Sequence, residues 1–229
     1  MLGKKSMKKI VDTYKKTSAF KYGLKISSPF IEDFSSVVEG GGEVLFIGPN
    51  THKTMTNDLS SHRLILVSVE EGGVFEYEER AEGTAHTKSD LHIFLRGKGA
   101  RANIKARYEV GGDSKLDILH KVYHEADETI SNIETRGVLS GDTHVIYRSD
   151  IQMKKGLKTL TGNENAKFLL LSKTAKIDAI PSLDIASREV KSNHSLSVSR
   201  IGEEELFYPK MRGLNETEAK EIILEGFLQ

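Results

Sequence analysis

The sequence predicts an all-β core, with a short helix before it and a helical segment after it. Two observations favour a parallel β-helix for the core. Continuous apolar stretches such as Phe168–Leu171 suit strands whose side chains stack on one another in a narrow interior. The Asn-Gly and Asp-Gly turns that mark tight antiparallel hairpins are missing between the strand-like runs. A β-sandwich and a β-barrel remain open, because they need the same kind of strands.

Residues 1–36 are expected to form a helix and a lead-in to the core. Met7, Ile10, Val11 and Tyr14 recur at helical spacing. The lysines around them form the one basic cluster of the sequence, and we expect it to be a solvated helix face. These residues are Lys4, Lys5, Lys8, Lys9, Lys15 and Lys16.

Residues 37–200 are expected to form the β-core, because the helical spacing gives way there to short runs rich in β-branched residues. Gly, Asn, Asp and Ser separate these runs, as is typical of strands joined by turns. The runs expected to be strands are Val44–Ile47, Arg63–Val69, Val74–Tyr77, Leu91–Leu95, Ala102–Val110, Leu116–Tyr123, Thr129–Leu139, His144–Ile151, Phe168–Leu171, Ile177–Ile185 and Leu196–Ser199.

Residues 201–229 are expected to return to helix. The first helix has one apolar stripe and ends at Gly213, a residue suited to the C-terminal cap. Pro209 lies inside this helix and is expected to kink or shorten it, because proline lacks the backbone N–H. The stripe consists of Ile201, Leu206, Phe207 and Met211.

A second helix is expected to begin after Asn215, whose side chain can cap it, with Glu218 as the reciprocal partner. Its apolar face could dock on the β-core or be presented to another protein. Docking is favoured, because most amphipathic helices bury their apolar stripe in their own domain. That face consists of Ala219, Ile222, Ile223 and Phe227.

Composition excludes several classes of function. Lys+Arg and Asp+Glu both number 33, so the formal net charge is zero, without the basic surplus of a nucleic-acid-binding protein. No apolar stretch approaches the ~20 residues that a membrane span needs. With no cysteine and no export signal, we expect a cytoplasmic protein without disulfides. The chain also has no thiolate of its own for an iron–sulfur cluster.

The end of the sequence carries a set of motifs at fixed spacing. His194 lies in a predicted strand and is followed by S-R-I-G-E-E-E-L-F-Y, then R-G-L, then an amphipathic helix that ends in Gly-Phe. This resembles the C-terminal signature of the SufB/SufD family, the scaffold subunits of the SUF iron–sulfur cluster assembly system. H-x-x-x-H from His120, R-G-V-L from Arg136 and L-L-L-S-x-x-A-x-I-x-x-x-P-x-L-x-I from Leu169 extend the resemblance. It implies a right-handed parallel β-helix in a compact version.

The resemblance also implies a role. It implies a non-catalytic, SufD-like scaffold subunit that works with an ABC-type ATPase similar to SufC. The β-helix would pair edge to edge with a SufB-like paralogue or with a second copy of itself. The C-terminal helices would bind the ATPase. The residues expected at that contact are Leu206, Phe207, Met211, Arg212, Gly213, Leu214, Ile222, Ile223 and Phe227.

His194 is the one candidate metal ligand, since the matching histidine of SufD-like subunits is implicated in nascent cluster assembly. The cysteine that precedes it there is Ser192 here, and the glutamate that follows it in SufB-like subunits is Ser195. The scaffold cysteine of SufB-like subunits falls near Ala166. A serine hydroxyl stays protonated at neutral pH and cannot replace a thiolate. We expect no cluster on the isolated chain, and a transient one only at an interface; the alternative for His194 is a plain surface residue.

His120 and His124, with Glu125 next to the second, resemble a metal-binding pattern. In a strand, however, positions i and i+4 lie roughly 13 Å apart, too far to ligate one ion. We therefore expect two exposed strand histidines, and the same of the remaining ones. These are His52, His62, His86, His92 and His144.

Two other functions stay open. The chain could be a homo-oligomeric β-helix protein that has diverged from cluster assembly. It could also be a carbohydrate-active enzyme on a β-helix, which would need clustered carboxylates, a basic residue and usually calcium. Asp178, Asp184 and Lys191 are scattered candidates for that chemistry and match no motif. No phosphate-binding loop occurs, so any nucleotide hydrolysis would come from another chain.

Overall fold

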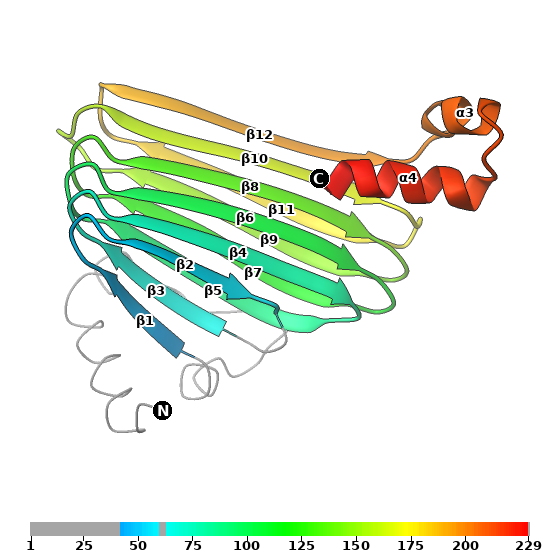
Figure 1. Ribbon diagram of the computed structural model, residues 1–229, viewed down its shortest axis with the longest axis horizontal. Helices are drawn as coiled ribbons and strands as arrows, with labels where there is room; N and C mark the ends of the chain where they lie inside the picture. The colour runs from blue at the N-terminus through cyan, green and yellow to red at the C-terminus, as the bar shows by residue number, and fades with distance from the viewer. Residues whose placement is uncertain (1–41, 60–62, 229) are drawn as a thin grey trace.

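The computed structural model describes residues 42–59 and 63–228 (Figure 1). Over these residues the chain is a parallel β-helix of two six-stranded sheets, followed by two helices. Every pair of neighbouring strands is parallel, which confirms the β-helix and rules out the antiparallel alternatives. The predicted helix and lysine cluster within residues 1–36 lie outside the described residues. The right-handed sense of the coil stays a prediction.

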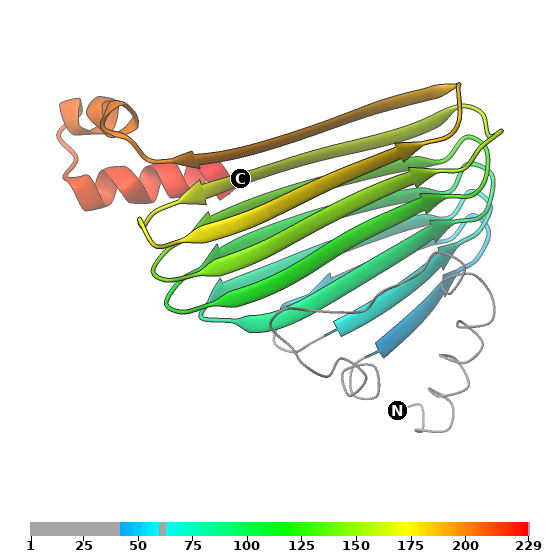
Figure 2. The same cartoon turned by 180° about the vertical axis from the view of Figure 1, so that it is seen from behind.

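Odd-numbered strands form one sheet and even-numbered strands the other, so the chain changes sheet after every strand. Figures 1 and 2 show the two sheets from opposite sides. The odd sheet has the order β1 (Gly42–Ile47), β3 (Arg63–Val69), β5 (His86–Leu95), β7 (Lys115–His124), β9 (His144–Met153) and β11 (Lys176–Ile185). The even sheet has the order β12 (Val190–Arg200), β10 (Leu160–Leu170), β8 (Ile130–Leu139), β6 (Arg101–Val110), β4 (Val74–Gly83) and β2 (His52–Asn57).

β2 was not predicted, and several strands are longer than the predicted runs. β2 reads H-K-T-M-T-N and has a single apolar residue, Met55, so it carries no strand signal. β10 and β12 begin well before the predicted runs Phe168–Leu171 and Leu196–Ser199. Their first halves contain Gly, Asn and Ser, which are residues typical of turns. Here strand pairing with the preceding coil overrides that local preference.

Stacking of equivalent residues holds successive coils together. In β6, buried residues alternate with partly or fully exposed ones, so every second side chain enters the space between the sheets. On the outer face, the Asn132 amide donates to Asn103 Oδ1, and the Asn163 amide donates to Asn132 Oδ1, both at 3.0 Å. This asparagine ladder fixes the register of three neighbouring strands.

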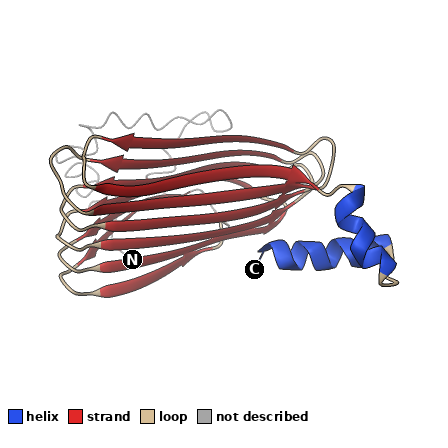
Figure 3. Ribbon diagram, turned by 90° about the horizontal axis from the view of Figure 1, so that it is seen from above, coloured by secondary structure: helices blue, strands red, loops and turns tan. Residues whose placement is uncertain are grey.

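The chain ends in α3 (Glu203–Met211) and α4 (Glu216–Leu228), which extend beyond one end of the strands (Figure 3). The cap at Gly213 is confirmed, since this residue has a left-handed φ of 91° just after α3. Pro209 lies inside α3, which ends two residues later at Met211, and the expected kink or shortening stays a prediction.

The predicted cap of α4 is confirmed. Asn215 Oδ1 accepts the backbone N–H groups of Thr217 and Glu218, both at 3.0 Å, and Glu218 Oε2 accepts the N–H of Asn215 at 2.8 Å. Neither helix of the described part of the chain is long and apolar enough to cross a membrane.

Candidate functional site

The last coil, formed by β11 and β12, leaves the interior of the β-helix open. Each of these two strands has one neighbour among the described strands. Val198 of β12 is in register with Phe168 of β10, yet Val198 is 46% exposed and Phe168 is 0% exposed. Ile185 of β11 is likewise 38% exposed, next to the buried Met153. Apolar side chains that a further coil would cover are therefore accessible here.

His194 lies on β12 in this open coil. It is in register with Glu164 of β10, which is 2% exposed, whereas His194 is exposed. The next residue of this column is the buried Ile133 of β8. Because residues in register on neighbouring strands share a face of the sheet, the imidazole lies on the interior side, beside a buried carboxylate.

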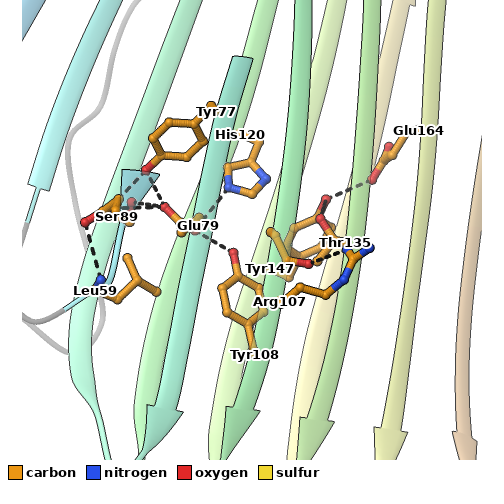
Figure 4. A network of polar contacts seen from close by, with 12 residues as sticks. Leu59, Tyr77, Glu79, Ser89, Arg107, Tyr108, His120, Thr135, Tyr147 and Glu164 are labelled. Carbon is orange, nitrogen blue, oxygen red and sulfur yellow. Dashed lines mark hydrogen bonds and ion pairs between the residues drawn. The ribbon is translucent and has the colours of Figure 1, made fainter. Parts of the chain in front are cut away.

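Glu164 is a residue that the sequence analysis did not identify. Its Oε1 accepts hydrogen bonds from Ser149 Oγ and, at 3.4 Å, from Tyr147 OH (Figure 4). Burial raises the pKa of Glu164, and the Ser149 hydrogen bond and the charge of His194 offset part of that rise. The sequence did contain one indication of its burial. Glu164 lies two residues from both Gly162 and Ala166, and in a strand these three residues point to the same, interior side.

Ser192 and Ser195 stand where the resemblance places a cysteine and a glutamate ligand, and both take part in strand pairing here. Ser192 Oγ donates to the carbonyl of Gly162 at 2.8 Å, and Ser195 Oγ donates to Asn165 Oδ1 at 3.0 Å. Ala166 is fully buried. No group of three or more His, Cys, Asp or Glu side chains that could hold a metal occurs within the described residues. His194 and Glu164 are two side chains of this kind that lie in register on neighbouring strands.

A second polar group lies deep in the β-helix around Glu79 of β4 (Figure 4). Glu79 Oε1 accepts from Tyr108 OH at 2.5 Å and lies 3.2 Å from His120 Nε2. Its Oε2 accepts from Tyr77 OH and Ser89 Oγ, both at 2.7 Å. All five residues are buried, so this carboxylate has donors on every side and no access to solvent.

The charge state of Glu79 follows from these partners. Burial alone would raise the pKa of its carboxyl group, but the hydrogen bond and charge of His120, with the Tyr108 and Ser89 donors, outweigh burial and lower it. Burial and the neighbouring carboxylate raise the pKa of Tyr77 and Tyr108, which stay neutral donors. We read this group as a structural element of the core, since a satisfied buried network specifies packing.

The histidines of the central coils correct an expectation. His92, His120 and His124 were expected to be exposed, but they are 0%, 0% and 1% exposed. His124 Nδ1 lies 2.7 Å from Thr129 Oγ1, and its Nε2 lies 2.9 Å from Ser131 Oγ. Burial lowers the pKa of His124 to about 4 and that of His92 to about 3. These histidines are buried by the strands and residues around them. Their burial could not be predicted from the fact that histidine is a polar residue.

The remaining described histidines lie nearer the surface, each beside a carboxylate. His52 and His86 are exposed and His144 is half-buried, while His62 lies outside the described residues. The pairs are His52–Glu76 at 3.3 Å, His86–Asp113 at 3.5 Å and His144–Asp178 at 2.8 Å.

The residues considered for a carbohydrate-active enzyme do not share a surface. Asp178 and Asp184 lie on β11 of the odd sheet, whereas Lys191 lies on β12 of the even sheet. Asp178 is also hydrogen-bonded to His144. The clustered carboxylates with a basic residue on one sheet face that such chemistry needs are not formed by these three residues.

The predicted partner-binding residues divide into two sets. Phe207, Met211 and Ile222 are 64%, 70% and 53% exposed, and Tyr208, which was not predicted, is 64% exposed. We call these four the apolar patch of the helices. Arg212 and Gly213 are exposed in the turn between the helices. The other predicted residues are buried or half-buried, namely Leu206, Leu214, Ile223 and Phe227.

Two arginines hold the end of α4 on the even sheet. Arg107 Nε donates to the carbonyl of Leu228 at 2.9 Å, and the guanidinium of Arg136 donates to the carbonyl of Phe227 at 2.8 Å. Glu134 pairs with both guanidinium groups, at 3.1 and 3.2 Å. Cations at a helix C-terminus satisfy its free carbonyl groups and oppose its dipole. The C-terminal end of α4 is therefore held on its own β-helix, while the apolar patch stays exposed; docking of the whole apolar face of α4 stays a prediction.

Comparison with known proteins agrees with this geometry. Residues 35–227 match the family model described as SUF system FeS cluster assembly, SufBD core domain. Iron–sulfur cluster assembly SufBD family proteins of Mycobacterium tuberculosis and Staphylococcus aureus are each 29% identical, over 160 and 161 residues, or 70% of this chain. The aligned part is 19% of the first relative and 35% of the second, so this chain spans a minor part of either. The chain is a member of the SufBD family of iron–sulfur cluster assembly proteins.

Proposed function

We propose that this protein is a non-catalytic scaffold subunit of a SUF-type assembly complex, and that an ABC-type ATPase binds its C-terminal helices. The observation that carries the proposal is the apolar patch of Phe207, Tyr208, Met211 and Ile222. Phe207, Tyr208 and Met211 lie on α3 and Ile222 lies on α4, and exposed aromatic and methionine side chains of this kind are typical of protein–protein contacts. The arginine contacts of α4 support a fixed presentation of this patch.

The last coil supports a second contact in the same complex. β11 and β12 have free edges within the described sheets, and a free edge invites pairing with another strand. We propose that a SufB-like paralogue or a second copy of this chain covers it. A transient iron–sulfur cluster would then form at that interface, with thiolates supplied by the paralogue, since this chain has no cysteine.

Co-purification with an ABC-type ATPase from the same genome tests the first contact. The double variant Phe207→Asp/Met211→Asp should abolish the complex while circular dichroism shows the β-helix unchanged. Phe46→Asp is a matched control, because Phe46 is 73% exposed but lies on β1, in the first coil. Binding that survives the double variant, or is lost equally with Phe46→Asp, would reject the helices as the contact.

The diverged homo-oligomer is the second candidate, and the absence of any cysteine favours it. The two functions differ in the species they predict. The scaffold should form a complex with the ATPase, whereas the homo-oligomer should stay a dimer when the ATPase is added. The mass of the eluted species, measured by light scattering, separates the two.

A further inference from the structure

We propose that Arg107, Glu134 and Arg136 form a releasable clamp that positions the helix pair of α3 and α4, and that opening of the clamp lets movement of the helices reach β12. The clamp itself requires only this chain. That an ATPase supplies the movement rests on the proposed function.

The helix pair is joined to the β-helix at two places. One is covalent, because β12 ends at Arg200 and α3 begins at Glu203 after a short link. The other is the clamp, which joins the end of α4 to β6 and β8. In the even sheet β10 lies between β8 and β12 (Figure 1). The two attachments therefore lie on different coils, one on the last coil and one on the central coils.

The clamp consists of one carboxylate between two guanidinium groups. Arg107 Nη2 and Arg136 Nε both donate to Glu134 Oε1, at 3.1 and 3.2 Å. Each arginine also donates to α4, through Arg107 Nε to the Leu228 carbonyl at 2.9 Å and through Arg136 Nη1 to the Phe227 carbonyl at 2.8 Å. The planar fork of a guanidinium group allows it to reach acceptors on the sheet and on the helix together. Glu134 thus orients both arginines toward the end of α4.

The clamp can open because it is polar and water reaches it. The side chains of Arg107 and Arg136 are each 23% exposed, and that of Glu134 is 36% exposed. Partial burial alone would raise the pKa of Glu134, but the charges and hydrogen bonds of the two arginines lower it, so its carboxylate stays charged. Ion pairs that water reaches contribute little to stability and are weakened by salt. Of the two attachments, only the clamp can therefore be released and formed again.

The state of the clamp decides which strands bear a force that a partner applies to the apolar patch. With the clamp closed, the helix pair is held by β6 and β8, and each of these strands has neighbours on both sides. With the clamp open, the same force reaches the β-helix through β12 alone, which has one neighbour among the described strands. β12 also carries His194. Arg107, Glu134 and Arg136 are therefore positioning residues that link the helix pair to this strand.

Distances between spin labels test the clamp in the isolated chain. The chain has no cysteine, so Glu109→Cys on β6 and Glu221→Cys on α4, both at exposed positions, introduce the only two sites for labelling. The doubly labelled parent should give one narrow distance distribution. Adding Arg107→Gln/Arg136→Gln should abolish the narrow distribution, because α4 loses both donors that hold its end.

The same column of the sheet supplies a matched control. Arg80 and Lys167 are in register with Arg107 and Arg136, one strand further out on each side. The pair Arg80→Gln/Lys167→Gln removes the same number of charges and should leave the distance distribution narrow. A narrow distribution in Arg107→Gln/Arg136→Gln would mean that apolar contacts hold α4, and it would overturn the inference. An equal loss in the control pair would overturn it as well.

Hydrogen exchange with the ATPase and ATP present tests the link to β12. The β12 amides should exchange faster in Arg107→Gln/Arg136→Gln than in the control pair, because only the first pair of changes leaves β12 as the single attachment. Equal exchange in both would reject the link. Failure of the proposed function gives a different result, since the wild-type chain itself would then not bind the ATPase, while the spin-label distances would still report the clamp.

Discussion

The central coils and the last coil use the same strand geometry but differ in what covers them. Phe168 and Val198 are consecutive residues of one interior column, and only the first is closed off by a following coil. In the centre, the polar Glu79 is enclosed by donors from five other residues. In the last coil, His194 is left accessible beside Glu164. Interior side chains are therefore accessible in the last coil, on which no further described coil packs, and enclosed in the central coils.

The largest effect should come from the enclosed carboxylate. Glu79→Ala leaves the hydroxyls of Tyr77 and Tyr108 and the imidazole of His120 without their acceptor. We expect the free energy of unfolding to fall by about 5 kcal/mol, because a broken buried network leaves several donors unpaired. Urea denaturation measures this. A loss below about 1 kcal/mol would mean that the network is replaced by water and does not organise the core.

The interior column gives a matched pair of variants. Phe168→Ala should lower the free energy of unfolding by about 3 kcal/mol, since it removes a fully buried ring and leaves a cavity. Val198→Ala, one coil further on, should cost less than about 1 kcal/mol, because Val198 is 46% exposed. Equal losses would show that a partner or a second copy covers the last coil in solution.

The buried His124 predicts a pH dependence. Its pKa is lowered to about 4 in the folded chain, from 6.5. Below pH 6.5 the unfolded chain takes up a proton that the folded chain cannot, so stability is full above pH 6.5 and falls as the pH drops toward 4. Between pH 7 and pH 5 we expect a loss of about 2 kcal/mol from this residue. His124→Gln should remove that part of the slope, and an unchanged slope would assign it to other groups.

The smallest effect should be that of His194→Ala. An exposed residue without a described hydrogen bond should change the free energy of unfolding by no more than about 0.5 kcal/mol. Its effect should appear in cluster assembly with a cysteine-bearing partner. A destabilisation above about 1 kcal/mol would instead make His194 part of the packing of the last coil.

Much of the fold could be predicted from local patterns. β3 carries a continuous apolar run, and the prediction Arg63–Val69 matches the strand. The cap at Asn215 needs only residues three apart, so it too was visible. β2 and the first half of β10 were not, because their polar residues adopt strand geometry through pairing with a neighbouring coil.

The candidate site was harder to predict for the same reason. His194 was found through motifs that lie next to it in the sequence. Glu164, its partner, precedes it by a full coil, and Ser149 comes from the opposite sheet. The arginines that hold α4 are likewise far from it in sequence, 121 and 91 residues away. Such contacts depend on the register of the coils, which no single segment specifies.

Hydrogen exchange along the even sheet tests the central claim most directly. In the isolated chain at low concentration, the amides of β12 should exchange much faster than those of β8, because no described strand stacks on the last coil. Adding a cysteine-bearing SufB-like partner, or raising the concentration of the chain itself, should slow exchange in β12 and leave β8 unchanged. A β12 that is already as protected as β8, or gains no protection under either condition, would contradict the account.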